Sequence, residues 1–186
     1  MSPKPLCHAL CLSIAALSLV ACRPGVQRQP AQQPVPVDSN AELMEYIGDQ
    51  AFITAEPACR ALHILWTGEV FEGDYAALVV KMEQAGIVSP GWKHPPDALI
   101  DRATLGYMIA RTTDIRSGLN WQLWGLGRYA YRELVYREIA VSKGEHSFVS
   151  GGEFLGILNR AEQYMKERDK RPIERVELGE EPGHGG

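Results

Sequence analysis

An internal repeat of about fifty residues constrains the fold of this chain more than any other feature of its sequence. Residues 100–111 read IDRATLGYMIAR and align with residues 149–160, VSGGEFLGILNR, at an offset of 49. The two segments share apolar residues at four positions and an arginine at the last. A weaker third copy starts at Ile53 and runs to Leu65. Each copy is an apolar residue, a capping residue and an amphipathic helix, which predicts a fold assembled from similar helical units.

The segments that precede residues 100–111 and 149–160 also correspond to each other. Residues 78–87 form a predicted helix that ends in Ala-Gly-Ile, and residues 131–139 form one that ends near Glu-Ile-Ala. A polar loop then leads to the next copy in each case. The predicted unit is therefore helix, sharp stop, loop, cap and helix. Capping residues are common, so a helical domain without repeats stays open as an alternative.

Capping residues mark where the helices are expected to begin. Ser39-x-x-Glu42 and Ser150-x-x-Glu153 are capping boxes, in which the hydroxyl and the carboxylate satisfy free amides of the first turn. Three further N-cap candidates are Thr54, Asp74 and Asp101. A fifth helix is expected over about 120–137, and extended structure is expected only at 87–88 and 138–141. The sequence therefore predicts a mainly α domain.

Three motifs in the second unit resemble the S-layer homology (SLH) module. They are Gly86-Ile87, the turn Pro95-Pro96-Asp97, and Ile100-Asp101-Arg102-Ala103 at a helix start. The SLH signature is a helix ending in Gly-Ile, a loop with Pro and Asp, and a Thr-Arg-Ala-Glu helix start. The resemblance implies a small helical bundle of two to three SLH-like helix-loop-helix repeats. It also implies grooves that bind cell-wall polysaccharide, with Arg102 in contact with anionic glycan.

The other two helix starts depart from that signature. Ile53-Thr54-Ala55-Glu56 lacks the arginine, and residues 149–153 lack it and displace the glutamate by one position. Asp101 replaces the motif threonine. The resemblance therefore implies the scaffold more strongly than the ligand. The candidate ligand-binding residues are Arg102, Asp101 and Trp92, the last as an aromatic platform for a sugar or, alternatively, a hydrophobic plug beneath its loop.

The N-terminus has the pattern of a targeting segment. Lys4 precedes an uncharged run, residues 6–21, that is shorter than the roughly 20 residues a membrane-spanning helix needs. Leu19-Val20-Ala21-Cys22 resembles the lipobox of bacterial lipoproteins, which implies removal of residues 1–21 and acylation of Cys22. Arg23 is not the Asp that retains such proteins at the inner membrane, which implies the outer membrane in a cell with two membranes. An uncleaved anchor, or a secreted protein with a chance cysteine, are the alternatives.

The remaining chain divides into three parts by composition. Residues 22–40 carry the Cys22 thiol and a Pro- and Gln-rich run, which we expect to be an extended tether that reaches about 50 Å. Residues 41–166 form the expected SLH-like helical domain. Residues 167–186 alternate charges with almost no apolar residues, and we expect this tail to be disordered.

Composition excludes several classes of protein. The chain is 45% hydrophobic and 23% charged, which is typical of a soluble domain and not of a disordered chain. Removal of residues 1–21 takes away Lys4 and changes the formal net charge from −4 to −5. This balance favours no nucleic-acid partner. Three of the four cysteines, Cys7, Cys11 and Cys22, precede the domain, so we expect no disulfide framework.

One pair of residues has the types needed for chemistry. Cys59 and His63 are four apart on a predicted helix and could face each other as a thiol nucleophile and its base, or as half of a zinc site. The alternative, a buried cysteine that acts as a small hydrophobe, fits the absence of nearby third and fourth ligands in the sequence. No phosphate-binding loop or serine-nucleophile elbow is present in the sequence. We expect neither a cofactor nor a metal, and no enzymatic activity.

These patterns lead to two functional hypotheses. The first is a membrane-anchored cell-envelope lipoprotein, held by lipid on Cys22, whose helical domain binds envelope polysaccharide or peptidoglycan. The second is a non-catalytic structural or interaction domain that docks another envelope protein and binds no glycan. A thiol enzyme that uses Cys59 and His63 is a third, remote possibility. The three units could close within one chain or require a second copy.

Overall fold

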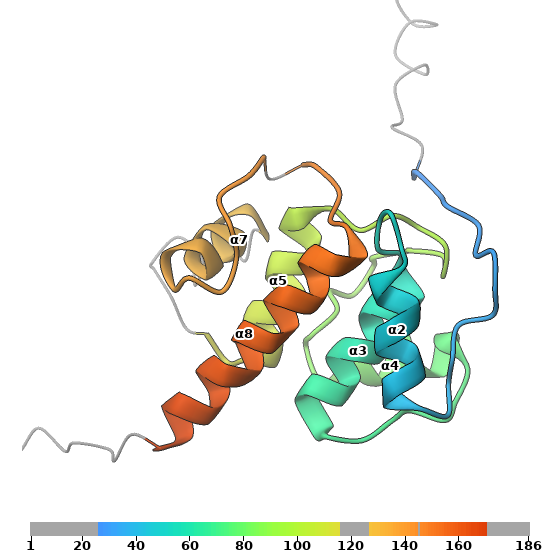
Figure 1. Cartoon of the computed structure of the whole chain (residues 1–186), viewed down its shortest axis with the longest axis horizontal. Coiled ribbons are helices and arrows are strands. Elements are labelled where there is room, and N and C mark those ends of the chain that lie inside the picture. Colours follow the sequence, from blue (N-terminus) through green and yellow to red (C-terminus); the bar gives the residue numbers. More distant parts are fainter. Residues whose placement is uncertain (1–25, 116–126, 145, 171–186) are drawn as a thin grey trace, which may run out of the picture.

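A computed structural model describes residues 26–115, 127–144 and 146–170. These ranges contain helices and no β-sheet (Figure 1), which confirms the mainly α prediction. Residues 1–25, which include the predicted signal segment and Cys22, residues 116–126, Glu145 and residues 171–186 lie outside the described ranges. The six helices of the described part are α2 (Asn40–Gly48), α3 (Ala55–Thr67), α4 (Tyr75–Gln84), α5 (Arg102–Thr112), α7 (Gly127–Tyr136) and α8 (Gly151–Lys170).

Five of the six described helices begin where a capping residue predicted. The sixth, α7, lies within the helix predicted over 120–137, whose expected start at residue 120 is outside the described residues. The side chains of Ser39, Asp74, Asp101 and Ser150 each accept a hydrogen bond from a backbone N–H in the first turn of their helix. Thr54 stands at the N-cap of α3, but its side chain makes no capping hydrogen bond. At that position only the location of the helix start was predicted correctly.

Helices α4 and α7 end in the same way, and the prediction of extended structure after them is wrong. Gly86 and Glu138 have positive φ angles of 72° and 60°. The next residue in each case, Ile87 or Ile139, donates its amide back across the last turn of the helix, to the carbonyl of the residue five positions earlier. Both isoleucines are buried. Their apolar side chains therefore fold under the helix end, and no strand forms.

The three repeat starts meet in the centre of the domain. The apolar residue ahead of each cap is fully buried: Ile53, Ile100 and Val149 are exposed by 2% or less. The amide of Ile100 donates to the carbonyl of Ile53 at 3.2 Å, and the amide of Ile53 donates to the carbonyl of Val149 at 2.8 Å. Residues 47 and 96 positions apart are thus joined by backbone hydrogen bonds.

Helix packing closes the three units into a ring within one chain. Each predicted unit consists of two helices that follow each other in the sequence, and we call them a helix pair. The pairs are α2 and α3, α4 and α5, and α7 and α8. The first helix of each pair packs on the second helix of another pair, α4 on α3, α7 on α5 and α2 on α8. At the α5–α7 contact a Cβ added to Gly106 would approach the backbone of Tyr131 to 2.8 Å, so the two helices touch without a side chain between them.

The segment before α2 is packed against the domain, and the prediction that it hangs free as a tether is wrong for its described part. Residues 26–39, which we call the strap, run along the side of the molecule (blue in Figure 1). Arg28 forms an isolated antiparallel bridge with Ala98, and Val35 packs against the core. The amino-acid composition of the strap did not predict this docking, because the strap is bound mainly through its backbone amides and carbonyls.

The last helix extends beyond the expected end of the domain. Helix α8 continues to Lys170, four residues past the expected boundary at 166. Arg168 donates a hydrogen bond to the carbonyl of Thr113 at 2.6 Å, which ties this extension to the end of α5. Within the described ranges no helix is both long enough and apolar enough to cross a membrane.

Candidate functional site

Arg102, the residue expected to contact a glycan, is buried in the domain and hydrogen-bonded to other residues of the same chain. It is the first residue of α5, and 4% of it is exposed. Its Nε and Nη2 atoms donate to the two carboxylate oxygens of Glu153 at 3.3 and 2.7 Å. Its Nη1 atom donates to the carbonyl of Phe148 at 2.9 Å and to the hydroxyl of Ser147. Every nitrogen of the guanidinium therefore has a partner between the second and third units.

The carboxylate of Glu153 is held in its charged form by this arrangement. Burial acts to raise its pKa, but the hydrogen bonds from Arg102 and Lys143 outweigh burial, and the pKa lies below its ordinary value. Lys143 contributes through an Nζ–Oε2 contact of 3.1 Å. Glu153 is the acidic residue of the last capping box, so the same motif that begins α8 also receives the arginine of α5.

Asp101 and Trp92 contact other residues. The Asp101 carboxylate accepts the amide of Thr104 at 2.7 Å, which is its N-cap role. The Trp92 ring lies 4.9 Å from the ring of Tyr107 and 5.8 Å from that of His94, and the tryptophan is half-buried. This packing agrees with the hydrophobic-plug alternative for Trp92. The three predicted ligand residues therefore have separate partners and do not form one open site.

Cys59 and His63 also have different surroundings. Burial raises the pKa of the Cys59 thiol to about 12, with a hydrogen bond to Tyr75 opposing the shift, so the thiol stays protonated near neutral pH. The Nδ1 atom of His63 lies 3.0 Å from the carbonyl oxygen of Glu69, and its ring packs edge-on against Phe71. Burial lowers the pKa of His63. Among the described residues no cluster of three or more potential metal ligands is found.

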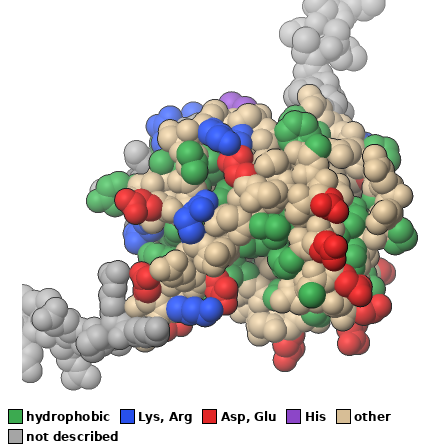
Figure 2. All heavy atoms as spheres, viewed as in Figure 1, with side chains coloured by type: hydrophobic (Ala, Val, Ile, Leu, Met, Phe, Trp, Pro, Cys, Tyr) green, Lys and Arg blue, Asp and Glu red, His purple; other side chains and the backbone are tan. Residues whose placement is uncertain are grey.

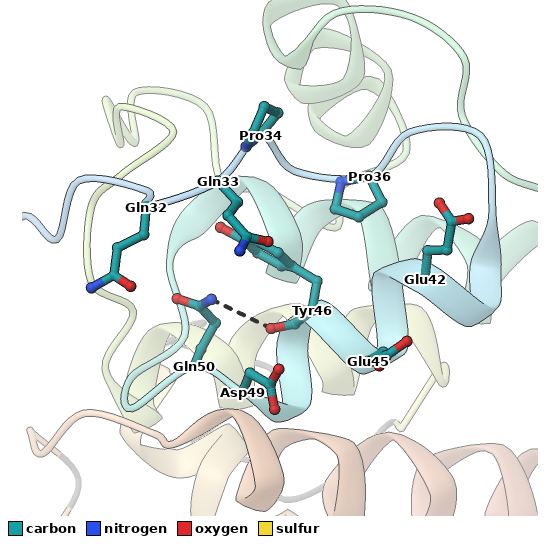
Figure 3. A pocket seen from close by; sticks show the side chains of 9 residues that line it. All are labelled: Gln32, Gln33, Pro34, Pro36, Glu42, Glu45, Tyr46, Asp49 and Gln50. Atoms are coloured by element: carbon teal, nitrogen blue, oxygen red, sulfur yellow. Dashed lines mark hydrogen bonds between the residues drawn. The ribbon is translucent and has the colours of Figure 1, made fainter.

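A polar cavity of about 380 Å³ lies between the strap and α2. Figure 3 shows its lining, with prolines and glutamines from the strap on one side and α2 on the other. We call it the strap pocket. Its lining residues are Gln32, Gln33, Pro34, Pro36, Glu42, Glu45, Tyr46, Asp49 and Gln50.

Tyr46 provides the aromatic surface of the strap pocket. Its side chain points from α2 toward the strap and lies beside Gln33 (Figure 3). The Gln50 side-chain amide donates to the Tyr46 carbonyl at 3.4 Å. Burial, with the negative charge of Glu56, raises the pKa of the Tyr46 phenol, which therefore remains a hydrogen-bond donor at neutral pH.

The polar groups of the strap pocket are amides and carboxylates. Its three glutamines can donate and accept hydrogen bonds, whereas Glu42, Glu45 and Asp49 can only accept them when ionised. No Lys, Arg or His is among the described residues that line it. Figure 2 shows acidic side chains gathered on the side of the molecule that carries α2. The pocket is suited to hydroxyl, amide or amine groups and not to anions.

A second hollow of about 480 Å³ lies among α2, α3 and α8. We call it the three-helix groove. Its polar lining side chains are Asn40, Asn159 and Glu162, and most of its other lining residues are aliphatic. The apolar side chains that line it are Met44, Ala61, Ile64, Leu65, Leu155 and Leu158.

Sequence reasoning missed both hollows. The strap pocket lies between the glutamines of the strap and α2, the helix that follows the strap directly. The local signal in the sequence was the capping box at Ser39, which places the start of α2 immediately after the strap. Nothing local in the sequence shows that residues 27–29 pair with residues 97–99. Comparison of the chain with protein-family models, with curated proteins and with solved structures found no match.

Proposed function

We propose that this chain is a lipid-anchored protein of the bacterial cell envelope whose helical domain binds envelope polysaccharide or peptidoglycan in the strap pocket. The observation that carries the proposal is the composition of that pocket: a tyrosine ring surrounded by amides and carboxylates in a cavity of about 380 Å³. Amides and carboxylates bind sugar hydroxyls by directional hydrogen bonds, and an aromatic ring packs on the apolar face of a sugar.

The arrangement of the helices supports the resemblance to SLH modules. Three helix pairs pack in a ring, and the residues ahead of their capping positions join at the centre. The scaffold proposed here is therefore a set of three degenerate SLH-like units closed within one chain.

The ligand we propose differs from the anionic glycan that the resemblance implied. The guanidinium of Arg102 is already hydrogen-bonded to Glu153, Ser147 and Phe148. The strap pocket carries three carboxylates, and a polyanion would be repelled from it. A neutral glycan, or one that bears free amines, such as amino groups on the peptide part of peptidoglycan, fits the charge of the pocket.

Co-sedimentation with insoluble cell-wall material tests this proposal. We expect the full chain in detergent to sediment with the wall, and Tyr46→Ala and Gln33→Ala to reduce the bound fraction several-fold. Tyr136→Ala is the matched control, because Tyr136 is 83% exposed on α7 and far from the strap pocket in sequence. Equal binding of the Tyr46 and Tyr136 variants would show that the strap pocket is not the binding site.

The charge of the ligand can be tested separately. Replacement of Glu42, Glu45 and Asp49 by Gln, Gln and Asn keeps their shapes and removes three negative charges. If the ligand carries amines, we expect binding to weaken and to lose its dependence on salt concentration. Unchanged affinity and salt dependence would assign the ligand to the neutral class.

The three-helix groove favours a second candidate function, docking of another envelope protein. Its lining of aliphatic side chains together with a few polar ones has the composition of a protein interface. A photo-crosslinking amino acid at Leu65 in the groove, with one at Val141 as an exposed control, would capture the partner in cells. A specific product from position 65, together with no sedimentation of the chain with wall material, would favour this function over glycan binding.

A further inference from the structure

The strap occupies one edge of a short backbone ribbon. Two backbone groups of residues 97–100 point to the strap. The carbonyl of Asp97 accepts a hydrogen bond from the amide of Gln29 at 2.9 Å, and the amide of Leu99 donates one to the carbonyl of Gln27 at 2.8 Å. The intervening groups point the other way, since the Ala98 carbonyl and the Ile100 amide bind residues 53–55. The strap is therefore an edge strand one residue pair long, laid on a ribbon that is already fixed to the core.

Side-chain contacts add to the two backbone hydrogen bonds of the strap. Arg28 Nη2 lies 2.7 Å from the Asp97 carboxylate, and the two side chains are 57% and 21% exposed. Exposed ion pairs contribute little to stability. Val35 adds an apolar contact with the core. The backbone hydrogen bonds, the partly exposed Arg28–Asp97 ion pair and the apolar packing of Val35 can be broken without unfolding the helical domain, since residues 26–38 belong to no helix.

The position of the strap links two properties of the protein. Docked, residues 32–36 form one wall of the strap pocket. Docked, the strap also shortens the connection to the proposed anchor. Only residues 23–25 then separate Cys22 from Val26, and these four residue steps span at most about 14 Å. Undocked, residues 23–40 become a spacer of about 50 Å, and the pocket loses that wall.

We propose that the strap is a two-state latch: docked, it completes the strap pocket and holds the domain close to the membrane, and undocked, it opens the pocket and lets the domain extend. Because a ligand in the pocket touches both walls, binding favours the docked state. The latch thus couples occupancy of the pocket to the distance between domain and membrane. The ligand and the anchor in this inference rest on the proposed function, whereas the docking equilibrium does not.

Amide hydrogen exchange of the full chain in detergent tests the docking equilibrium. We expect Arg28→Glu to increase exchange at Gln29 and Leu99 about fivefold or more, as for loss of an exposed ion pair. The charge swap Arg28→Glu with Asp97→Arg restores the slower rate. The amide of Ile100 is an internal control, since it bonds to Ile53 on the other edge of the ribbon. Unchanged exchange at Gln29 and Leu99 in Arg28→Glu overturns the latch.

The same measurement with soluble peptidoglycan fragments as the probe separates the latch from the proposed function. We expect the fragments to slow exchange at Gln29 in the wild type, and to bind Arg28→Glu more weakly, by the factor by which the docked fraction falls, which is at most about fivefold. Binding without any effect on Gln29 exchange overturns the coupling and leaves glycan binding intact. If the fragments do not bind while Arg28→Glu still loosens the strap, the latch stands and the proposed ligand is wrong.

The spacer role is tested with the lipidated chain on a supported bilayer. Neutron reflectometry measures the height of the domain above the bilayer surface. We expect the domain of Arg28→Glu to lie on average farther from the bilayer than that of the wild type, up to the limit of about 50 Å set by the length of the spacer. Equal heights in the two proteins, with exchange at Gln29 increased in the variant, overturn the spacer role of the strap.

Discussion

Arg102 and Glu153 are 51 residues apart in the sequence and form a 2.7 Å ion pair that joins the first turn of α5 to the first turn of α8. The two side chains are 4% and 12% exposed, so water cannot replace either partner at low cost. The pair stands at the boundary of the second and third units. The arginine that most resembles a family ligand residue therefore contributes here to the assembly of the domain.

Removal of Arg102 should destabilise the domain strongly. We expect Arg102→Met to lower the free energy of unfolding by about 3 kcal/mol, because Glu153 would keep its charge in a largely buried position. Arg128→Met, at an exposed arginine on α7, is the matched control and should change it by less than about 0.5 kcal/mol. Urea unfolding measures both. The double variant Arg102→Met with Glu153→Leu should recover much of the loss, and no recovery would contradict the pairing.

The same ion pair predicts a dependence of stability on pH. The pKa of Glu153 is lower in the folded state than in the unfolded chain, where it is about 4.3. Its contribution to stability is therefore fully present above that value and is lost as the pH falls through the lower, folded pKa. We expect the stability difference between the wild type and Glu153→Gln to narrow below about pH 4. A difference that stays constant from pH 7 to pH 3 would contradict this.

The contact between α5 and α7 predicts opposite effects for two glycine substitutions in helices. An added Cβ at Gly106 meets the Cβ and backbone of Tyr131, whereas one at Gly152 in α8 meets nothing within 4 Å. We expect Gly106→Ala to cost about 1–3 kcal/mol by overpacking. Gly152→Ala should stabilise the protein by up to about 1 kcal/mol, because alanine is the better helix former. Thermal unfolding distinguishes them, and equal shifts would rule out the close helix contact.

Burial of Cys59 predicts an unreactive thiol. The thiol is 3% exposed, and its pKa is raised to about 12 by burial, so very little thiolate is present at neutral pH. We expect Cys59 in the folded chain to resist alkylation by iodoacetamide and to react within minutes in denaturant. Peptide mass spectrometry locates the adduct. Rapid labelling in the folded state would restore the thiol-enzyme hypothesis.

The proposed anchor predicts metabolic labelling at one residue. We expect cells that express the chain to incorporate radiolabelled palmitate into it, and Cys22→Ala to abolish the label and leave the unprocessed precursor. Cys11→Ala, in the same N-terminal segment, is the matched control and should keep the label. Incorporation that persists in Cys22→Ala would refute acylation at this position.

Local patterns in the sequence predicted where five of the described helices begin. Ser39, Asp74, Asp101 and Ser150 cap their helices as expected, because a capping hydrogen bond spans three residues. The stop after α4 followed from Gly86, since glycine adopts a positive φ without strain. The equivalent stop at Glu138 was less visible and was mistaken for the start of a strand.

The candidate site could not be found in the same way. Arg102 has the residue type and the place in the motif of a ligand contact, and nothing within a few residues of it shows that Glu153 takes its charge. The strap has the composition of a free tether, and its pairing with Asp97 spans 69 residues. Both misjudged features depend on partners that are distant in the chain.

The sequence by itself determined that the described part of this chain is mainly helical and where five of its helices begin, because these properties depend on residues within one or two helical turns of each other. The tertiary structure alone decided that the units close in a ring, that Arg102 is internal and that the strap docks. Closure brings together groups that lie from 47 to about a hundred residues apart in the sequence. Their burial then decides whether a charge is available to a ligand or is neutralised by another part of the same chain.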